Sequence, residues 1–157
     1  MTTRSLIALA LWIVGSLAAG IIGAVATQPG AWYAALDKPA WTPPNWLFGP
    51  VWTTLYVLMG VAAWMVWERR ASLNVAPALG LFVAQLFVNA LWSWLFFGYH
   101  RIGFALVDIV VLWLLILGAI VLFWRVRPLA GGLLLPYIVW VSYATALNAA
   151  IWLRNSG

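Results

Sequence analysis

Residues 103–124, GFALVDIVVLWLLILGAIVLFW, form a long apolar stretch. Asp108 is the only charged residue within it, and a helix needs about 20 consecutive apolar residues to cross the hydrocarbon core of a bilayer. A backbone in lipid must satisfy its hydrogen bonds inside its own segment unless a barrel closes. The ~10-residue alternation that is typical of barrel strands is absent. The stretch therefore predicts a membrane-spanning α-helix.

The rest of the chain has the same character. Hydrophobic residues make up 66% and charged residues 7% of its 157 residues, whereas soluble domains average about 45–50% apolar and about 25% charged residues. Clusters of charge separate five long apolar stretches. We predict an all-α integral membrane protein in which residues 1–157 form a single domain. It is expected to be a bundle of five transmembrane helices at about 5–27, 48–67, 76–98, 103–124 and 130–153.

The basic residues lie near the predicted helix ends, where their side chains snorkel to lipid head groups. The net charge of +5 therefore indicates a lipid bilayer as the partner, and no nucleic acid. Basic residues on the side of the N-terminus outnumber those on the other side, which favours an N-terminus that faces the cytoplasm or its equivalent. The larger group comprises Arg4, Arg69, Arg70, Arg125 and Arg127, and the smaller one Lys38, Arg101 and Arg154.

The connection between the first two helices, from about Gln28 to Leu47, is long and rich in tryptophan and proline. Pro39, Pro43 and Pro44 fix their own φ angles and disfavour helix for the residues before them. Because such a segment loses little conformational entropy on ordering, we predict that it folds back over the helix ends as a lid. The alternative is a plain belt of tryptophans at head-group depth.

Aromatic and polar side chains recur on one face of three predicted helices. Tryptophan alone accounts for 13 residues, and residues three, four and seven apart share a helix face. Such converging stripes predict a pocket with flat walls and a few hydrogen-bonding groups, as in most small-molecule sites. The alternative is that the amides bond across helices while the tryptophans only pack. The stripes comprise Trp52, Tyr56 and Met59; Gln85, Asn89, Trp92 and Phe96; and Tyr137, Trp140, Ala144 and Asn148.

The sequence argues against metal and conventional catalytic chemistry. The chain has no cysteine and a single histidine, His100, so it offers neither a thiolate metal site nor a bis-histidine haem site. No nucleophile-and-base arrangement or known catalytic motif is present. We therefore expect no metal and no required cofactor. Asp108, the acid within a span, is expected to pair with an arginine or a helix N-terminus, or else to carry protons or a cation.

Small residues spaced by four let two membrane helices approach closely. Ala76, Gly80 and Ala84 have this spacing, as do residues of the first helix, and they predict a homodimer through the third helix or a contact within the chain. In the fifth helix, Pro136 removes a backbone donor and predicts a kink.

The chain also resembles a known family through the stretches WYAALDKPAWTPPNWLFGPVWTTLYVLMG (32–60), QLFVNALWSWLFFG (85–98) and PYIVWVSYATALNAAIWLRNSG (136–157). These are similar to the TspO/translocator protein family, also called tryptophan-rich sensory proteins or peripheral benzodiazepine receptors. The resemblance implies a five-helix protein, usually dimeric, of bacterial cell membranes or mitochondrial-type outer membranes. It implies binding of protoporphyrin IX and of synthetic isoquinoline or benzodiazepine ligands under the first loop. The ligand-lining positions would be Tyr33, Trp41, Pro44, Trp52, Asn89, Trp92, Trp140, Ala144 and Asn148.

Three functions remain as hypotheses. The leading one is a membrane sensor or regulator that binds tetrapyrroles. The second, which the resemblance implies, is a light-dependent porphyrin-degrading enzyme that uses Trp52 and Trp140. The third is a transporter of porphyrin or sterol, although an odd number of helices argues against the inverted-repeat plan of many transporters.

Overall fold

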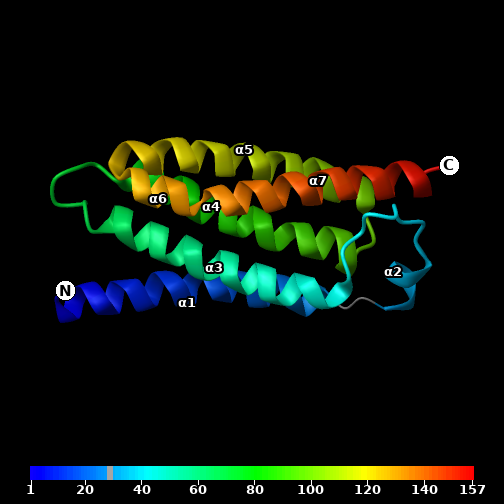
Figure 1. Cartoon of the computed structure of the whole chain (residues 1–157), viewed down its shortest axis with the longest axis horizontal. Helices are drawn as coiled ribbons and strands as arrows, with labels where there is room; N and C mark the ends of the chain where they lie inside the picture. The colour runs from blue at the N-terminus through cyan, green and yellow to red at the C-terminus, as the bar shows by residue number, and fades with distance from the viewer. Residues whose placement is uncertain (28–29) are drawn as a thin grey trace.

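A computed structural model describes residues 1–27 and 30–157. Gln28 and Pro29, with which the expected first loop begins, lie outside the described residues. The described chain is helical, without strands, and contains five helices that are long and apolar enough to cross a membrane (Figure 1). The predicted all-α five-helix membrane fold is confirmed. The spans are α1 (Thr3–Ala26), α3 (Asn45–Trp67), α4 (Ala76–Ser93) with the π-helical turn η1 (Trp94–Gly98), α5 (Ile102–Val126), and α6 (Pro128–Leu133) followed by α7 (Leu135–Asn155).

The first connection is more helical than the prolines suggested. A short helix, α2 (Ala31–Ala35), lies within it, and α3 begins at Asn45, ahead of the predicted start near residue 48. Pro44 takes the position just before α3 in an extended conformation. A proline there costs nothing, because the first turn of a helix has no backbone acceptors for its N–H groups. The connection between α1 and α3 therefore ends at Pro44, earlier than the predicted end near Leu47.

The fifth span breaks where a kink was predicted. α6 ends at Leu133, Leu134 forms a turn, and α7 begins at Leu135 with Pro136 in its first turn. Proline fits the first turn of a helix, whereas deeper in a helix it lacks the N–H that bonds the preceding turn and favours a kink or a break. The break sets the direction of α7 and hence of the aromatic side chains that it carries.

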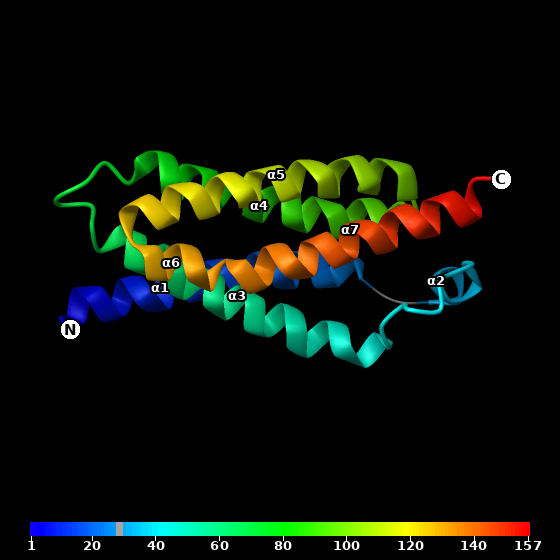
Figure 2. The same ribbon diagram turned by 45° about the horizontal axis from the view of Figure 1, so that its top comes forward.

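The helices pack as a ring in which α1 contacts α3 and α4, α4 contacts α5, α5 contacts α6 and α7, and α6 returns to α3 (Figure 2). Two glycines allow α1 and α3 to approach closely. A Cβ atom at Gly60 would lie 2.5 Å from the Ile13 Cα atom, and one at Gly20 would lie 2.5 Å from a ring carbon of Tyr56. The close contact is thus made by Gly20 and Gly60, since Gly15, the first of the equally spaced small residues in α1, faces open space.

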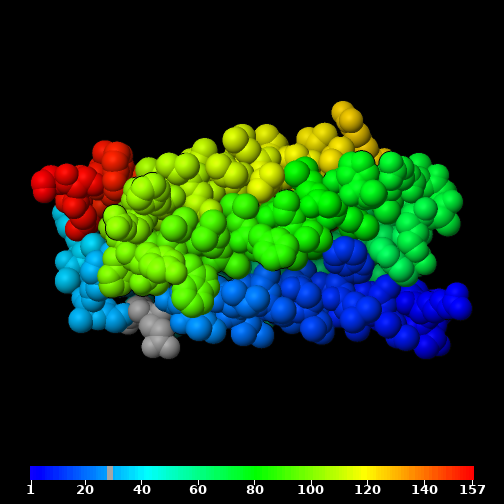
Figure 3. All heavy atoms as spheres, turned by 180° about the vertical axis from the view of Figure 1, so that it is seen from behind, coloured from blue at the N-terminus to red at the C-terminus, as the bar shows by residue number. Residues whose placement is uncertain are grey.

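Large apolar side chains cover the outside of the bundle, as expected for a lipid-facing surface. From behind, α1, α4 and α5 lie side by side (Figure 3), and Leu11, Phe87 and Leu114 are among their exposed side chains. The two chain termini lie at opposite ends of the bundle (Figure 1). The arginines grouped on the N-terminal side in the sequence share that end, at the start of α1 and in the α3–α4 and α5–α6 connections.

Candidate functional site

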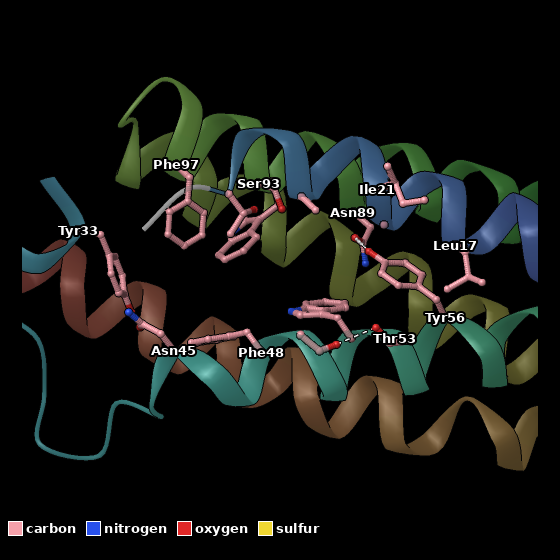
Figure 4. A pocket seen from close by; sticks show the side chains of 16 residues that line it. Leu17, Ile21, Tyr33, Asn45, Phe48, Thr53, Tyr56, Asn89, Ser93 and Phe97 are labelled. Atoms are coloured by element: carbon pink, nitrogen blue, oxygen red, sulfur yellow. Dashed lines mark hydrogen bonds between the residues drawn. The ribbon is translucent and has the colours of Figure 1, made fainter. Parts of the chain in front are cut away.

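A cavity of about 390 Å³ lies between α1, α3 and α4, with α2 at one end (Figure 4). Its volume falls within the range of ordinary small-molecule sites, about 300–1,000 Å³. Most of the wall is aromatic or aliphatic. The lining residues are Leu17, Gly20, Ile21, Ala24, Thr27, Tyr33, Asn45, Phe48, Gly49, Trp52, Thr53, Tyr56, Asn89, Trp92, Ser93 and Phe97.

The α3 wall is built from side chains that recur at every turn of the helix. Phe48, Trp52 and Tyr56 are spaced by four and share one face of α3. The Trp52 ring stacks on Tyr56, with ring centroids 5.6 Å apart. From behind, α7 supports Trp52 through edge contacts with Tyr137 at 6.2 Å and Trp140 at 6.5 Å. Packing therefore fixes the orientation of the indole beside the cavity.

A buried chain of hydrogen bonds joins the predicted stripes on α3, α4 and α7. The Tyr56 hydroxyl donates to Asn89 Oδ1 (2.5 Å), and Asn89 Nδ2 donates to the Tyr137 hydroxyl (2.6 Å). The Tyr137 hydroxyl in turn donates to Gln85 Oε1 (2.7 Å). An amide has two donor hydrogens and two acceptor lone pairs, so Asn89 keeps one of each for a ligand. The three stripes converge, as the pocket prediction required.

The α4 wall depends on a second amide. Trp92 Nε1 donates to Asn148 Oδ1 (2.9 Å), and Asn148 Nδ2 donates to the Ile102 carbonyl (3.1 Å). Trp92 also stacks on Phe96, with ring centroids 5.3 Å apart. Asn148 therefore holds Trp92 in place rather than lining the cavity. The amides bond across helices, as the alternative interpretation expected, and the same bonds position the cavity wall.

The predicted ligand-lining residues fall into three groups. Tyr33, Trp52, Asn89 and Trp92 line the cavity. The α7 residues Trp140, Ala144 and Asn148 are not part of the lining. Trp140 contacts Phe48 and Trp52 instead, and its buried Nε1 has no hydrogen-bond partner in the described residues.

The remaining two predicted residues lie outside the cavity. Trp41 is 47% exposed and packs its ring against Tyr143, 5.6 Å away between centroids. Pro44 is exposed just before α3. The structure therefore does not bring either residue into the cavity.

Sequence reasoning missed the α1 wall. Leu17, Gly20, Ile21 and Ala24 line the cavity, but they carry neither an aromatic ring nor a hydrogen-bonding side chain. Nothing in their residue types distinguishes them from lipid-facing positions of the same helix. The one signal was Gly20, whose missing side chain makes room for the Tyr56 ring.

The first connection is fastened over one end of the bundle. Trp32 stacks on His100, with ring centroids 4.0 Å apart, and His100 adopts a left-handed backbone conformation (φ 56°) in the turn before α5. Asp37 exchanges hydrogen bonds of 3.1 and 3.0 Å with Asn155 at the end of α7. These contacts tie the segment on either side of Tyr33 to the helix ends.

Tyr33 lines the cavity at this end. Its side chain is buried at 5% exposure, and Lys38 Nζ donates to its carbonyl (2.7 Å) and lies over its ring, 4.7 Å from the centroid. Burial, and to a lesser degree the nearby Tyr143, raises the pKa of Tyr33 above its ordinary value. The phenol therefore stays neutral at physiological pH and can donate a hydrogen bond.

Titratable groups do not gather into a reaction centre. Among the described residues, no group of three His, Cys, Asp or Glu side chains could hold a metal ion. We expected Asp108 to pair with an arginine, but within the described ranges it makes no such ion pair. The ion pairs of the described residues join Glu68 to Arg70 and Asp37 to Arg154. Asp108 is 8% exposed, its Oδ2 atom has no hydrogen-bond partner in the described residues, and it does not line the cavity.

Comparison with known proteins identifies similar chains. The family model described as the TspO/MBR family matches residues 7–153. Protein CrtK of Rhodobacter capsulatus is 44% identical over 155 residues, which cover 98% of this chain and 96% of that protein. The human translocator protein is 42% identical, over 80% of this chain and 76% of its own length. A tryptophan-rich sensory protein of Cereibacter sphaeroides is 40% identical, over 77% of this chain and 75% of its own length.

Proposed function

The chain belongs to the TspO/MBR family, and from this premise we propose that it is a membrane sensor or regulator that binds a tetrapyrrole. The ligand would be a flat, hydrophobic molecule of the protoporphyrin IX type, held in the cavity between α1, α3 and α4. A relative named as a translocator protein and another named as a tryptophan-rich sensory protein support a sensor or transporter role.

The aromatic composition of the cavity carries the proposal. Trp52 projects from α3 and Trp92 from α4, and Tyr33, Phe48, Tyr56 and Phe97 complete the lining rings. Aromatic rings prefer offset-stacked or edge-to-face contacts, worth about 0.5–1.5 kcal/mol per pair beyond area burial. A macrocycle offers such contacts on both faces and at its rim. The wall therefore favours a flat conjugated ligand over a flexible aliphatic one.

The polar groups of the lining suggest how such a ligand would be oriented. Tyr33, Asn45 and Thr27 line the end of the cavity beside α2, where the Tyr33 side chain points toward Asn45 (Figure 4). Carboxylate side chains of a tetrapyrrole would bond there, close to the end of the bundle and to water. Its macrocycle would lie deeper, against Trp52 and Trp92. Synthetic isoquinoline or benzodiazepine ligands would occupy the same aromatic walls and compete with it.

We further propose that the segment containing α2 acts as a lid for this site. Its fastening through Trp32–His100 and Asp37–Asn155 supports this, and so does the presence of Tyr33 in the cavity wall. The homodimer is likewise a proposal. Ala76 and Gly80 are exposed on α4, and a Cβ atom at Gly80 would have no neighbour within 4 Å, so this stripe is free to meet a second copy of the chain.

Fluorescence quenching tests ligand binding. Protoporphyrin IX should quench the tryptophan fluorescence of the detergent-solubilised protein saturably. Trp92→Leu should weaken the apparent affinity about tenfold, equal to about 1.4 kcal/mol, because the variant removes an aromatic wall. Trp124→Leu, which removes an exposed tryptophan of α5 outside the cavity, is the matched control and should leave the affinity unchanged. Unsaturable quenching, or equal affinities for both variants and the wild type, would contradict the proposal.

A further inference from the structure

We propose that the cavity is filled sideways from the bilayer, through an opening between α1 and α3 bounded by Ile21, Ala24, Gly49 and Thr53. This inference rests on the proposed function, because it concerns how the ligand of that cavity arrives. It narrows the ligand class to amphiphiles that dissolve in the hydrocarbon region and reach the protein from lipid rather than from water.

α1 and α3 are in contact in their middle parts and are separated by the cavity toward the end of α1 and the start of α3. At Gly60, α3 comes so close to the backbone of Ile13 that a Cβ atom would lie 2.5 Å from the Ile13 Cα atom. The next contact is that of Gly20 with the Tyr56 ring. Beyond Tyr56, toward the start of α3, the cavity separates the two helices. The gap between the two helices therefore widens from the Gly60–Ile13 contact toward the opening.

The residues that bound the opening are both lining and exposed. Ile21 and Ala24 on α1, and Gly49 and Thr53 on α3, line the cavity and are exposed on the outer surface. Ile21 is 65% exposed, and it lies on the α1 side of the cavity, opposite Thr53 on the α3 side (Figure 4). A Cβ atom at Gly49 would meet nothing within 4 Å. The cavity is thus continuous with the outer surface between these residues.

This outer surface belongs to two helices that are long and apolar enough to cross a membrane. Ile21 and Ala24 belong to the span Thr3–Ala26, and Gly49 and Thr53 to the span Asn45–Trp67. The Thr53 hydroxyl is bonded to the Gly49 carbonyl (2.8 Å) within its own helix, so it presents no free donor to the lipid. In a bilayer, an opening with an apolar rim between these two helices would face lipid, and an amphiphile could cross it without passing through water.

At the other end of the cavity, Tyr33 forms part of the wall. Tyr33 is buried there, and the segment on either side of it is held by the stacked pair Trp32–His100 and by the hydrogen bonds between Asp37 and Asn155. Arrival from water past Tyr33 would require these contacts to break. Arrival from lipid requires none of them to break, so the structure favours the lateral route.

The rate of protoporphyrin IX binding tests the route. The full chain is placed in lipid nanodiscs and mixed with porphyrin-loaded vesicles, and quenching is followed in time. Gly49→Leu places a side chain in the opening, and Ala24→Phe narrows it from the α1 side. Each should slow association about tenfold and should also slow dissociation, because one passage serves both directions. Gly15→Leu, an equally open glycine on α1 that does not line the cavity, is the matched control and should bind at the wild-type rate.

A second part of the experiment tests whether protoporphyrin IX reaches the cavity from lipid or from water. Association should follow the amount of porphyrin per lipid rather than its aqueous concentration. Asn155→Ala, which removes the two hydrogen bonds to the Asp37 backbone, should leave the rate unchanged. Faster binding by Asn155→Ala together with wild-type rates for both opening variants would overturn the lateral route. An increase in dissociation without slower association would also overturn it, because the altered residues would then act only as contacts of the bound ligand. Absence of saturable quenching in the wild type is a different result, since it contradicts the proposed function itself.

Discussion

At the scale of single residues, Asn89 links the architecture of the bundle to its cavity. It accepts from Tyr56 of α3 and donates to Tyr137 of α7, and its amide also lines the cavity. An unpaired polar group inside a membrane bundle is costly, which is why such groups are bonded to one another. A residue that lines the cavity is therefore also one that joins three helices.

Removing the Tyr137 hydroxyl measures how much the hydrogen bonds between α4 and α7 contribute to stability. Tyr137→Phe leaves Gln85 Oε1 without its donor and Asn89 Nδ2 without its acceptor. Hydrogen bonds between membrane helices average about 0.6 kcal/mol and reach about 1.7 kcal/mol. Since two bonds are lost, we expect a destabilisation of about 1–3 kcal/mol in denaturant unfolding from detergent micelles.

The control for this variant is Tyr99→Phe, which alters a tyrosine that is exposed after η1. It should leave the free energy of unfolding unchanged. In a double-mutant cycle, Asn89→Leu and Tyr137→Phe should couple, because the two side chains share a bond. Additive effects of the two substitutions would contradict the hydrogen-bonded chain.

At the scale of elements, the close approach of α1 and α3 sets the shape of the cavity. Gly60→Ala would place a methyl group within 2.5 Å of the Ile13 backbone, and backbone cannot move aside as a flexible side chain can. Overpacking of this kind costs about 1–3 kcal/mol. We expect Gly60→Ala to lower the thermal unfolding temperature of the protein in detergent, as measured by circular dichroism.

Gly15→Ala is the matched substitution on the facing helix. A Cβ atom there meets nothing within 4 Å, and alanine favours a helix interior over glycine by about 0.5–1 kcal/mol. We expect unchanged or slightly higher stability. Equal destabilisation by Gly15→Ala and Gly60→Ala would show that the α1–α3 contact is not the cause.

Sequence patterns predicted some of these helices better than others. Long apolar runs predicted all the spans, because the bilayer imposes length and composition on each helix separately. The same patterns missed α2 and placed the start of α3 too late, because the proline-rich stretch predicted a loop throughout. Pro44 instead fits the position before a helix, and Pro50 lies inside α3. The break at Leu134 was foreseen as a kink at Pro136.

At the scale of the whole molecule, sequence alone predicted the convergence of three helix faces but not the position of the cavity between them. Trp52, Asn89 and Trp92 reach it, whereas Trp140 and Asn148 support those side chains from α7. The distance between neighbouring helices determines which residues of a stripe line the cavity and which pack against those lining residues. That distance is set by packing elsewhere, as at Gly20 and Gly60, and no single helix encodes it.

The exposed small residues of α4 give a prediction about assembly. If a second copy packs on Ala76, Gly80 and Ala84, then Gly80→Leu fills a surface that must be flat for close helix approach. We expect native mass spectrometry in mild detergent to record a dimer for the wild type and a monomer for Gly80→Leu. A wild-type monomer, or a dimer that persists in Gly80→Leu, would contradict an interface through this stripe.

We propose that the aromatic cavity between α1, α3 and α4 holds a flat tetrapyrrole. A structure determined by electron cryomicroscopy or crystallography with protoporphyrin IX bound tests it most directly. We predict that the macrocycle lies between Trp52 and Trp92 with its carboxylates toward Tyr33 and Asn45. Porphyrin found only on the lipid-facing surface, with the cavity unchanged, would contradict the account.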